Sequence, residues 1–317
     1  MFELVNSTIT LHGVVRSLSA GLIIRKLVSA ILVWFLFCQC AHATPLSLWR
    51  INNDRATVYL LGSIHALKPE MYPLAAEINH AFRKSDKTVF EVDITEASSY
   101  EMNLAIQRRG TYIMPKTIES ELSSETIRLL RNYLDQNNLD FAEVRQLRPW
   151  LLSMRISLME LTRLGYSRDL GIDYHYQQMA RRKGKPILQL ETFMQQIDLL
   201  AADPPRIQDI SLRYLLEEIQ QADQVIAELI SAWQEGKADK MYELSAQSSM
   251  DHPELEAQLN RLLDDRNVAM VKKIDSYMAT DDTYFVVVGA LHMGGPRGIL
   301  RLLGKDHDIV QLHHSSE

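Results

Sequence analysis

The stretch Tyr284-Phe-Val-Val-Val-Gly-Ala-Leu-His292 decides the fold, because it joins a continuous apolar run to a glycine and a histidine. A short β-branched and aromatic run of this kind is typical of a strand buried on both faces. The stretch Val58-Tyr-Leu-Leu-Gly-Ser-Ile-His65 repeats the arrangement near the other end of the chain. Ligands of open α/β sheets bind outside the carboxyl ends of the strands. We therefore expect His65 and His292 to face one site, with Gly62 and Gly289 allowing the backbone to turn sharply or approach closely.

Short apolar segments with polar flanks predict five strands, and longer segments with a helical rhythm fill the gaps between them. The predicted strands are Thr57–Leu61, Thr88–Val92, Pro186–Leu190, Tyr284–Val288 and Asp308–Leu312. The predicted helices are Glu125–Leu134, Trp150–Leu164, Asp173–Arg182, Leu212–Trp233 and Leu259–Tyr277. The fold class is therefore α/β, or mixed α+β: a central β-sheet flanked by helices, with helical insertions near residues 94–180 and 200–280. The pattern does not predict the order or direction of the strands.

Acidic side chains follow two of the other predicted strands. In Val89-Phe-Glu-Val-Asp93, alternation places Glu91 and Asp93 on one face. A carboxylate inside so apolar a segment is costly unless it is paired or binds a ligand. Glu191 ends the segment Leu188-Gln-Leu-Glu191 in the same way. Four strands thus direct two histidines and three carboxylates toward what we expect to be one rim.

Arg266 is the expected partner of these carboxylates. It falls on the apolar stripe of its predicted helix, where a guanidinium must meet a carboxylate or an oxyanion. Glu91 is then either a buried ion-pair partner of Arg266 or a catalytic group. Asp173 either caps the helix that begins there or supports the site, and Glu191 either acts directly or orients a neighbour.

The residue types at this rim are those of a hydrolytic metal site. Two histidines and a carboxylate with an open position suit zinc, manganese, cobalt or iron(II). In a metal enzyme of this kind the ligands come from separate strands, and the ion lowers the pKa of bound water and polarises a carbonyl. A remaining carboxylate then serves as general base, and Arg266 stabilises the oxyanion. The familiar signatures of zinc proteases, serine hydrolases and P-loop proteins are absent from the sequence.

The first 43 residues are predicted to be a signal peptide. Arg25 and Lys26 precede an apolar run that ends in Ala41-His-Ala43, a small-x-small cleavage site. The alternative is an uncleaved N-terminal anchor, although the run is short for a membrane span. With cleavage after Ala43, residues 44–317 form one periplasmic or secreted domain with no stable membrane span.

Cysteine usage and charge exclude several classes of function. Both cysteines, Cys38 and Cys40, lie in the predicted signal peptide, so the mature domain has no disulfide, thiol nucleophile or cysteine-ligated zinc. The formal net charge is −6, and there is no basic stripe. Nucleic acid is therefore not an expected partner.

The motifs in their order along the chain resemble the TraB/GumN family, which also includes the Tiki proteins. The matching segments are Leu48-Trp-Arg50, Val58–His65, Val89–Asp93, Arg148-Pro-Trp150, Leu170-Gly-Ile-Asp173, Leu190-Glu-Thr192 with Gln195 and Gln196, Asp265-Arg-Asn267 and Val288–His292. The resemblance covers nearly all of the mature chain, and the ordered set is more specific than any one piece.

This resemblance implies a hydrolase fold similar also to erythromycin esterase and to the haem-binding lipoprotein ChaN. Tiki proteins are similar to metal-dependent proteases with paired Gly-x-x-His motifs and a glutamate, which correspond here to His65, His292 and Glu91. Asn267 enters the supporting set through the same resemblance. The sequence departs from the family pattern at Ser63, Leu291 and Met293, and none of these departures removes a candidate ligand.

We therefore expect an exported metal-dependent hydrolase, metallopeptidase-like, that acts on a peptide or protein substrate. The alternative is a non-catalytic periplasmic protein of the same fold that binds a peptide or haem in the same cleft. A third hypothesis is metal-free ester hydrolysis with a histidine as general base. Metal analysis, a Soret band and chelator sensitivity distinguish the three.

Overall fold

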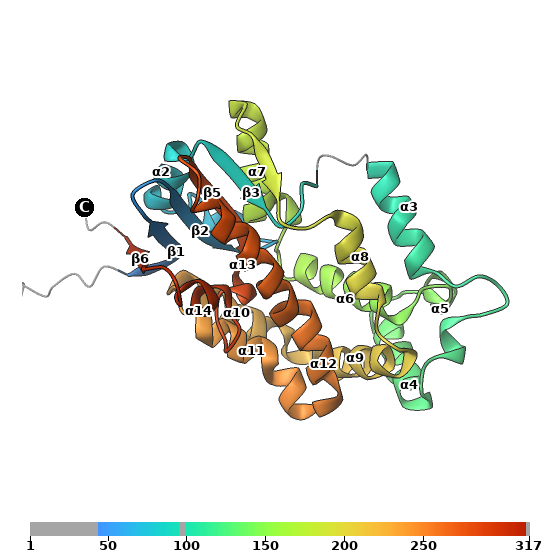
Figure 1. Ribbon diagram of the computed structural model, residues 1–317. Coiled ribbons are helices and arrows are strands. Elements are labelled where there is room, and N and C mark those ends of the chain that lie inside the picture. The colour runs from blue at the N-terminus through green and yellow to red at the C-terminus, as the bar shows by residue number, and fades with distance from the viewer. Residues whose placement is uncertain (1–43, 95–98, 315–317) are drawn as a thin grey trace, which may run out of the picture. The chain divides into compact units, whose positions relative to one another are not determined.

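The computed structural model describes residues 44–94 and 99–314, and the predicted signal peptide lies outside them. They contain a six-stranded sheet in the order β4-β3-β5-β2-β1-β6 (Figure 1). The strands are β1 (Pro45–Asn52), β2 (Thr57–Ser63), β3 (Lys87–Phe90), β4 (Ile187–Gln189), β5 (Thr283–Gly289) and β6 (Ile309–His313).

Four adjacent strands of this sheet run in the same direction. β5 pairs in parallel with β2 on one side and with β3 on the other, and β3 pairs in parallel with β4. In the register, Ser63 lies opposite Gly289 and Phe90 lies opposite Gln189. β1 is antiparallel to both β2 and β6. The carboxyl ends of β2, β5, β3 and β4 therefore share one edge of the sheet.

Helices connect the strands. They are α2 (Ala76–Lys84), α3 (Ser99–Gly110), α4 (Ser124–Gln136), α5 (Phe141–Val144), α6 (Pro149–Arg163), α7 (Ile172–Lys183), α8 (Phe193–Ala201), α9 (Pro205–Glu218), α10 (Ala222–Gln234), α11 (Ala238–Asp251), α12 (Glu256–Leu259), α13 (Asp265–Tyr277) and α14 (Ile299–Leu303). A π-helical turn, Asn260–Asp264, joins α12 to α13. Among the helices of residues 44–94 and 99–314, none combines the length and apolar character needed to cross a membrane.

The apolar run of β5 is continuous because both faces of the sheet are covered. Phe285 and Val287 pack into a buried cluster with residues of α2, α7 and α10. Val286 and Val288 pack into a second cluster with residues of α13 and α14. A third cluster, formed by residues of α4, α6, α8 and α9, makes a separate helical core. The fold class expected from the sequence, a central sheet flanked by helices with helical insertions, is confirmed.

Several elements differ from the sequence-based expectation, and two of these differences have a clear physical reason. Strand β1 was not among the predicted strands, because its first half is buried continuously from Leu46 to Trp49 and burial alternates only from Trp49 onward. The predicted helix Leu212–Trp233 is two helices, α9 and α10, separated by a 3₁₀ turn. The interruption has a packing reason, since Leu212 belongs to the helical core and Trp233 to a cluster on the sheet.

Trp233 ties α10 to the strand that carries the first glycine–histidine motif. Its indole Nε1–H donates to the carbonyl oxygen of Gly62 at 2.8 Å, and its own carbonyl accepts from the buried hydroxyl of Ser47 at 2.7 Å. These groups are buried, so water cannot replace a hydrogen bond that is lost. Removing one partner therefore leaves the other group without a hydrogen bond.

We predict that Trp233→Phe lowers the free energy of unfolding by about 1 kcal/mol more than Trp150→Phe does. Both rings are buried, but the indole of Trp150 makes only a long hydrogen bond of 3.4 Å. Urea denaturation of the two variants measures the difference. Equal losses of stability would contradict this role for Trp233.

Candidate functional site

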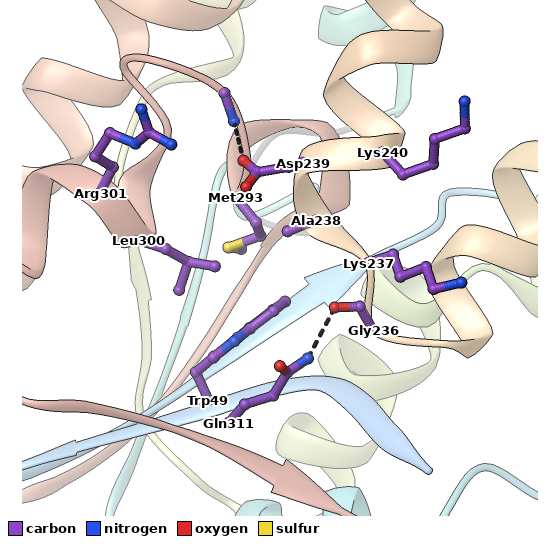
Figure 2. Close-up of a pocket in the computed structure, with 11 residues that line it drawn as sticks. Trp49, Gly236, Lys237, Ala238, Asp239, Lys240, Met293, Leu300, Arg301 and Gln311 are labelled. Carbon is purple, nitrogen blue, oxygen red and sulfur yellow. Dashed lines mark hydrogen bonds between the residues drawn. The ribbon is translucent and has the colours of Figure 1, made fainter.

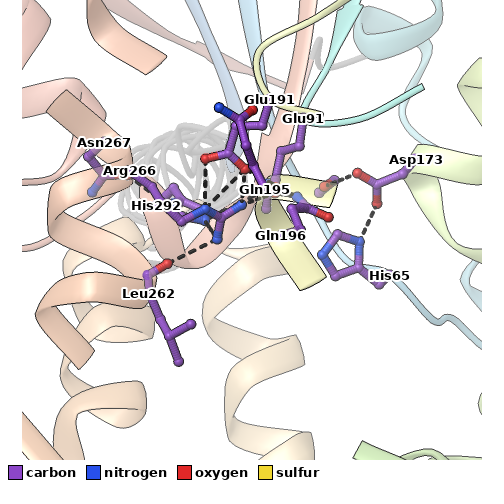
Figure 3. Close-up of polar contacts among 12 residues, drawn as sticks. His65, Glu91, Asp173, Glu191, Gln195, Gln196, Leu262, Arg266, Asn267 and His292 are labelled. Carbon is purple, nitrogen blue, oxygen red and sulfur yellow. Dashed lines mark hydrogen bonds and ion pairs between the residues drawn. The ribbon is translucent and has the colours of Figure 1, made fainter. Parts of the chain in front are cut away.

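The predicted site residues follow the ends of the four parallel strands. His65 comes two residues after β2, and His292 lies in the 3₁₀ turn, Ala290–His292, that follows β5. Glu91 follows β3 directly, and Glu191 comes two residues after β4. Figure 3 shows these side chains together at the shared edge. The parallel pairing of the four strands therefore places these side chains at one edge of the sheet, where the sequence analysis expected a common rim.

Gly289 lies at the point where three of these side chains meet. A β-carbon at this position would lie 3.1 Å from Glu91 Oε1, 3.6 Å from His65 Nε2 and 3.6 Å from His292 Cδ2. The space exists only because glycine has no side chain. Gly62 serves a related purpose, since a β-carbon there would lie 3.2 Å from Ala290 Cβ. The two glycine–histidine motifs can therefore lie against each other.

Asp173 orients His65. His65 Nδ1–H donates to Asp173 Oδ2 at 2.8 Å, and Ser63 Oγ–H donates to Asp173 Oδ1 at 2.8 Å. Attraction to Asp173 raises the pKa of His65 to about 9. The His65 side chain is 68% exposed, so it is the member of the site that solvent reaches most easily.

The interpretation of Asp173 as a helix cap is wrong. Helix α7 has Gly171 as its N-cap residue and no side-chain cap. A β-carbon at Gly171 would lie 2.3 Å from the carbonyl oxygen of His65, so glycine lets the start of α7 approach the backbone of His65. Asp173, in the first turn of α7, is free of the capping role and contacts Ser63 and His65 instead.

His292 has a different environment. It is buried, with 4% of its surface exposed, and its Nδ1 lies 2.6 Å from Asn267 Oδ1. Asn267 is fully buried, and its Nδ2 donates to the carbonyl oxygen of Arg297 at 3.0 Å. His292 Nε2 lies 3.0 Å from Arg266 Nη1 and 4.0 Å from Glu91 Oε1. Burial lowers the pKa of His292 to about 4, so the ring is neutral at neutral pH.

Arg266 joins the two buried glutamates. Its Nη2 donates to Glu91 Oε2 at 2.6 Å and to Glu191 Oε2 at 2.8 Å, and its Nε donates to Glu191 Oε1 at 2.9 Å. Nη1 donates to His292 Nε2 and to the carbonyl oxygen of Leu262, in the π-helical turn, at 2.9 Å. All five N–H groups of the guanidinium thus have acceptors. Such widened turns occur often at functional sites.

Glu91 is held in its ionised form. Burial by itself raises the pKa of Glu91, but attraction to His292, Arg266 and His65 and a 2.6 Å hydrogen bond from the Gly289 N–H outweigh burial and lower the pKa to about 2. Gln196 on α8 donates to Glu91 Oε2 at 3.1 Å and to Glu191 Oε2 at 3.3 Å. Two buried carboxylates therefore share one guanidinium, so the group formed by Glu91, Glu191 and Arg266 carries an excess of negative charge.

The structure gathers most of the predicted site residues and places one with a different partner. His65, Glu91, His292, Arg266, Asn267, Glu191, Asp173, Gly62 and Gly289 all lie at the rim or contact its side chains. Asp93 forms an ion pair with Arg181 of α7, its Oδ1 lying 3.5 Å from Nη2. β3 ends at Phe90, so the strand alternation that placed Asp93 beside Glu91 does not extend that far.

Gln196 had no assigned role in the sequence analysis, although it belonged to a matching motif. The signal that could have found its role is the capping box, in which Thr192 Oγ1 accepts from the Gln195 N–H and Gln195 Oε1 accepts from the Thr192 N–H. Because Thr192 caps α8 directly after Glu191, the side chain of Gln196 in the first turn tilts back toward the end of the strand.

In the part of the chain that the structure describes, no group of three or more histidine, cysteine or acidic side chains is arranged to hold a metal ion as it stands. Arg266 gives a physical reason, because its guanidinium takes the lone pair of His292 Nε2 and one oxygen of Glu91. The candidate donors are present around Gly289, but a hydrogen-bond donor lies among them.

A separate pocket of about 600 Å³ lies beside β1 and β6 (Figure 2). Trp49, Lys237, Asp239, Arg301 and Gln311 are among the residues that line it. Gln311 Nε2 donates to the carbonyl oxygen of Gly236 at 2.8 Å, which closes one wall. None of the site residues described above lines this pocket.

Comparison with known proteins agrees with these motifs. The model of the TraB/PrgY/gumN family matches residues 47–311. Two relatives, each named uncharacterized protein YbaP, come from Escherichia coli (strain K12) and from Shigella flexneri. Each is 23% identical to the chain over 248 residues, which are 77% of this chain and 87% of the relative.

We predict that Arg266→Met lowers the free energy of unfolding by about 3–5 kcal/mol at neutral pH, because two buried carboxylates lose their cation. The loss becomes smaller as the pH falls toward 5. Without Arg266, burial raises the pKa of Glu91, and protonation then removes the uncompensated charge. Urea denaturation across this pH range measures both effects.

Arg55→Met is the matched control, since Arg55 makes a two-bond ion pair with Asp281 at the surface. Its loss should cost far less than the loss of Arg266, because water screens exposed pairs. If Arg266→Met cost no more than this control, the buried cluster would not have the strength assigned to it.

Proposed function

Because the chain belongs to the TraB/PrgY/gumN family, we propose that it is a metal-dependent hydrolase, a peptidase whose catalytic centre is formed by His65, Glu91 and His292. The observation that carries the proposal is the meeting of these three side chains within 3.6 Å of one point beside Gly289. Three groups from three strand ends gather there, in space that a single methyl group would fill. Such convergence of titratable groups is typical of a catalytic site.

The chemistry of the donors supports a divalent cation. Both histidines have a polar partner on Nδ1, which leaves Nε2 directed into the site, as second-shell partners of metal ligands do. Glu91 supplies an ionised carboxylate, and the buried excess of negative charge favours an added cation. His65 Nε2, Glu91 and His292 Nε2 would hold the ion, which would replace Arg266 as the partner of His292. When bound, it would lower the pKa of a bound water and polarise the carbonyl of the substrate.

The other residues position this centre. Asp173 keeps His65 in one orientation, and Ser63 keeps Asp173 in place. Arg266 and Gln196 hold the two glutamates together against their mutual repulsion. Because every N–H of Arg266 already has an acceptor, we assign it to positioning Glu91 rather than to direct contact with the reacting oxygen.

A second candidate is hydrolysis without a metal, with His65 as general base. The specific observation in its favour is the 2.8 Å bond between His65 Nδ1 and Asp173, which resembles the pairing of base and carboxylate in hydrolytic triads. In this case Arg266 remains the ion-pair partner of Glu91. The two candidates differ in their response to chelators.

We predict that His65→Ala, Glu91→Gln and His292→Gln each reduce cleavage of a peptide library by at least about 100-fold. His80→Ala is the control, because His80 is an exposed histidine outside the site. Mass spectrometry of the products measures cleavage, and circular dichroism checks the fold. Full activity in both histidine variants would contradict the proposal.

Metal content separates the candidates. The metal-dependent reaction requires about one divalent ion per chain and loses its activity to chelators, whereas the His65 route keeps its activity without the ion. A folded wild-type protein that binds peptide or haem but cleaves nothing would favour a binding protein of the same fold.

We also propose that the protein is exported. The support is the apolar run followed by Ala41-His-Ala43. Expression of the full chain in a Gram-negative bacterium should yield a periplasmic form that begins at Thr44, as read by N-terminal sequencing. Ala43→Arg should leave the precursor uncut, because the cleavage site needs a small residue. A membrane-bound wild-type protein of full mass would instead indicate an uncleaved anchor.

A further inference from the structure

We infer that Asn267 is a positioning residue that fixes His292 in the tautomer with the proton on Nδ1, so that an unprotonated Nε2 faces Glu91 and Arg266. The inference rests on the proposed function only for its catalytic consequence. It is supported by a series of hydrogen bonds in which the outermost groups can act only as donor or only as acceptor.

The chain begins at a backbone carbonyl. The carbonyl oxygen of Arg297 can only accept, so the atom of Asn267 that lies 3.0 Å from it must be the amide nitrogen. This contact decides which way the fully buried side chain of Asn267 points. The amide oxygen then faces His292.

The amide oxygen of Asn267 also can only accept. It lies 2.6 Å from His292 Nδ1, so that nitrogen carries the proton. An asparagine and a histidine alone would not determine the tautomer, because either the amide oxygen or the amide nitrogen could contact the ring. The carbonyl of Arg297 removes this freedom.

The opposite side of the ring agrees independently. A guanidinium has no acceptor, and Arg266 Nη1 lies 3.0 Å from His292 Nε2. A proton on Nε2 would place two donors against each other. Asn267 and Arg266 are neighbours on α13, so a single helical segment contacts both nitrogens of the ring.

The two histidines of the paired motifs also differ in their chemical environment. His65 has a carboxylate as its partner and an exposed ring, whereas His292 has a neutral amide and a buried ring. An amide cannot supply the charge that favours an imidazolium. His292 is thereby kept as a neutral nitrogen donor directed into the site.

The test is a long-range ¹H–¹⁵N spectrum of the full chain, labelled with ¹⁵N in histidine, at neutral pH with a chelator present. His292→Gln identifies the His292 signals by their loss. The wild-type protein should show a protonated Nδ1 and an unprotonated Nε2 at His292. A protonated Nε2 would overturn the inference, and this measurement needs no folded variant of Asn267.

Two substitutions then test Asn267 itself. Asn267→Asp keeps an acceptor at Nδ1, so Nδ1 should stay protonated. Asn267→Leu removes the acceptor and should produce a population with a proton on Nε2. Unchanged histidine signals in a folded Asn267→Leu variant would show that Asn267 does not fix the tautomer.

Activity provides a separate readout. If the proposed hydrolysis holds, Asn267→Leu should reduce metal affinity or turnover by about 10–100-fold, as loss of an outer-shell partner of a ligand does. The spectra use neither substrate nor metal, so the tautomer inference and the proposed hydrolysis can fail separately.

Discussion

The site depends on the sharing of one guanidinium by two buried carboxylates. Glu91 and Glu191 follow neighbouring parallel strands, and like charges brought so close repel strongly at low dielectric. Arg266 offsets this repulsion with bonds to both, and Gln196 bridges the same two carboxylates. Because these four residues come from the ends of β3 and β4, from α8 and from α13, the cluster joins the sheet to two helices. Its loss would remove the polar contacts that join the strand ends to α8 and α13.

The two histidines complete this arrangement from opposite sides. Small residues make it possible, since Gly62 packs against Ala290 and Gly289 leaves the space in which Glu91, His65 and His292 meet. Each histidine then takes its character from the partner on its Nδ1. The carboxylate of Asp173 raises the pKa of His65, whereas burial beside an amide lowers that of His292. The paired motifs are alike in sequence and different in environment.

Much of this site could be predicted from local sequence. The strand order and the long-range contacts of individual side chains could be seen only in the structure. The glycine–histidine pairs and the position of Arg266 on an apolar stripe are local signals, and the structure brings these residues together. Strand order is not a local property, so the parallel alignment of β2, β5, β3 and β4 came only from the structure. Asp173 was interpreted as a helix cap because aspartate is common at that position. In the structure its carboxylate contacts His65 instead. Asp93 was misplaced because alternation was extended beyond Phe90, where β3 ends.

Cobalt(II) soaked into crystals of the protein and located by its anomalous scattering would show whether a metal centre forms at this rim. A metal centre there predicts one strong site within bonding distance of His65 Nε2, His292 Nε2 and a Glu91 oxygen, with the Arg266 guanidinium moved away from His292. Cobalt bound only elsewhere, or a Glu91–Arg266–His292 cluster unchanged at saturating cobalt, would contradict a metal centre at this rim.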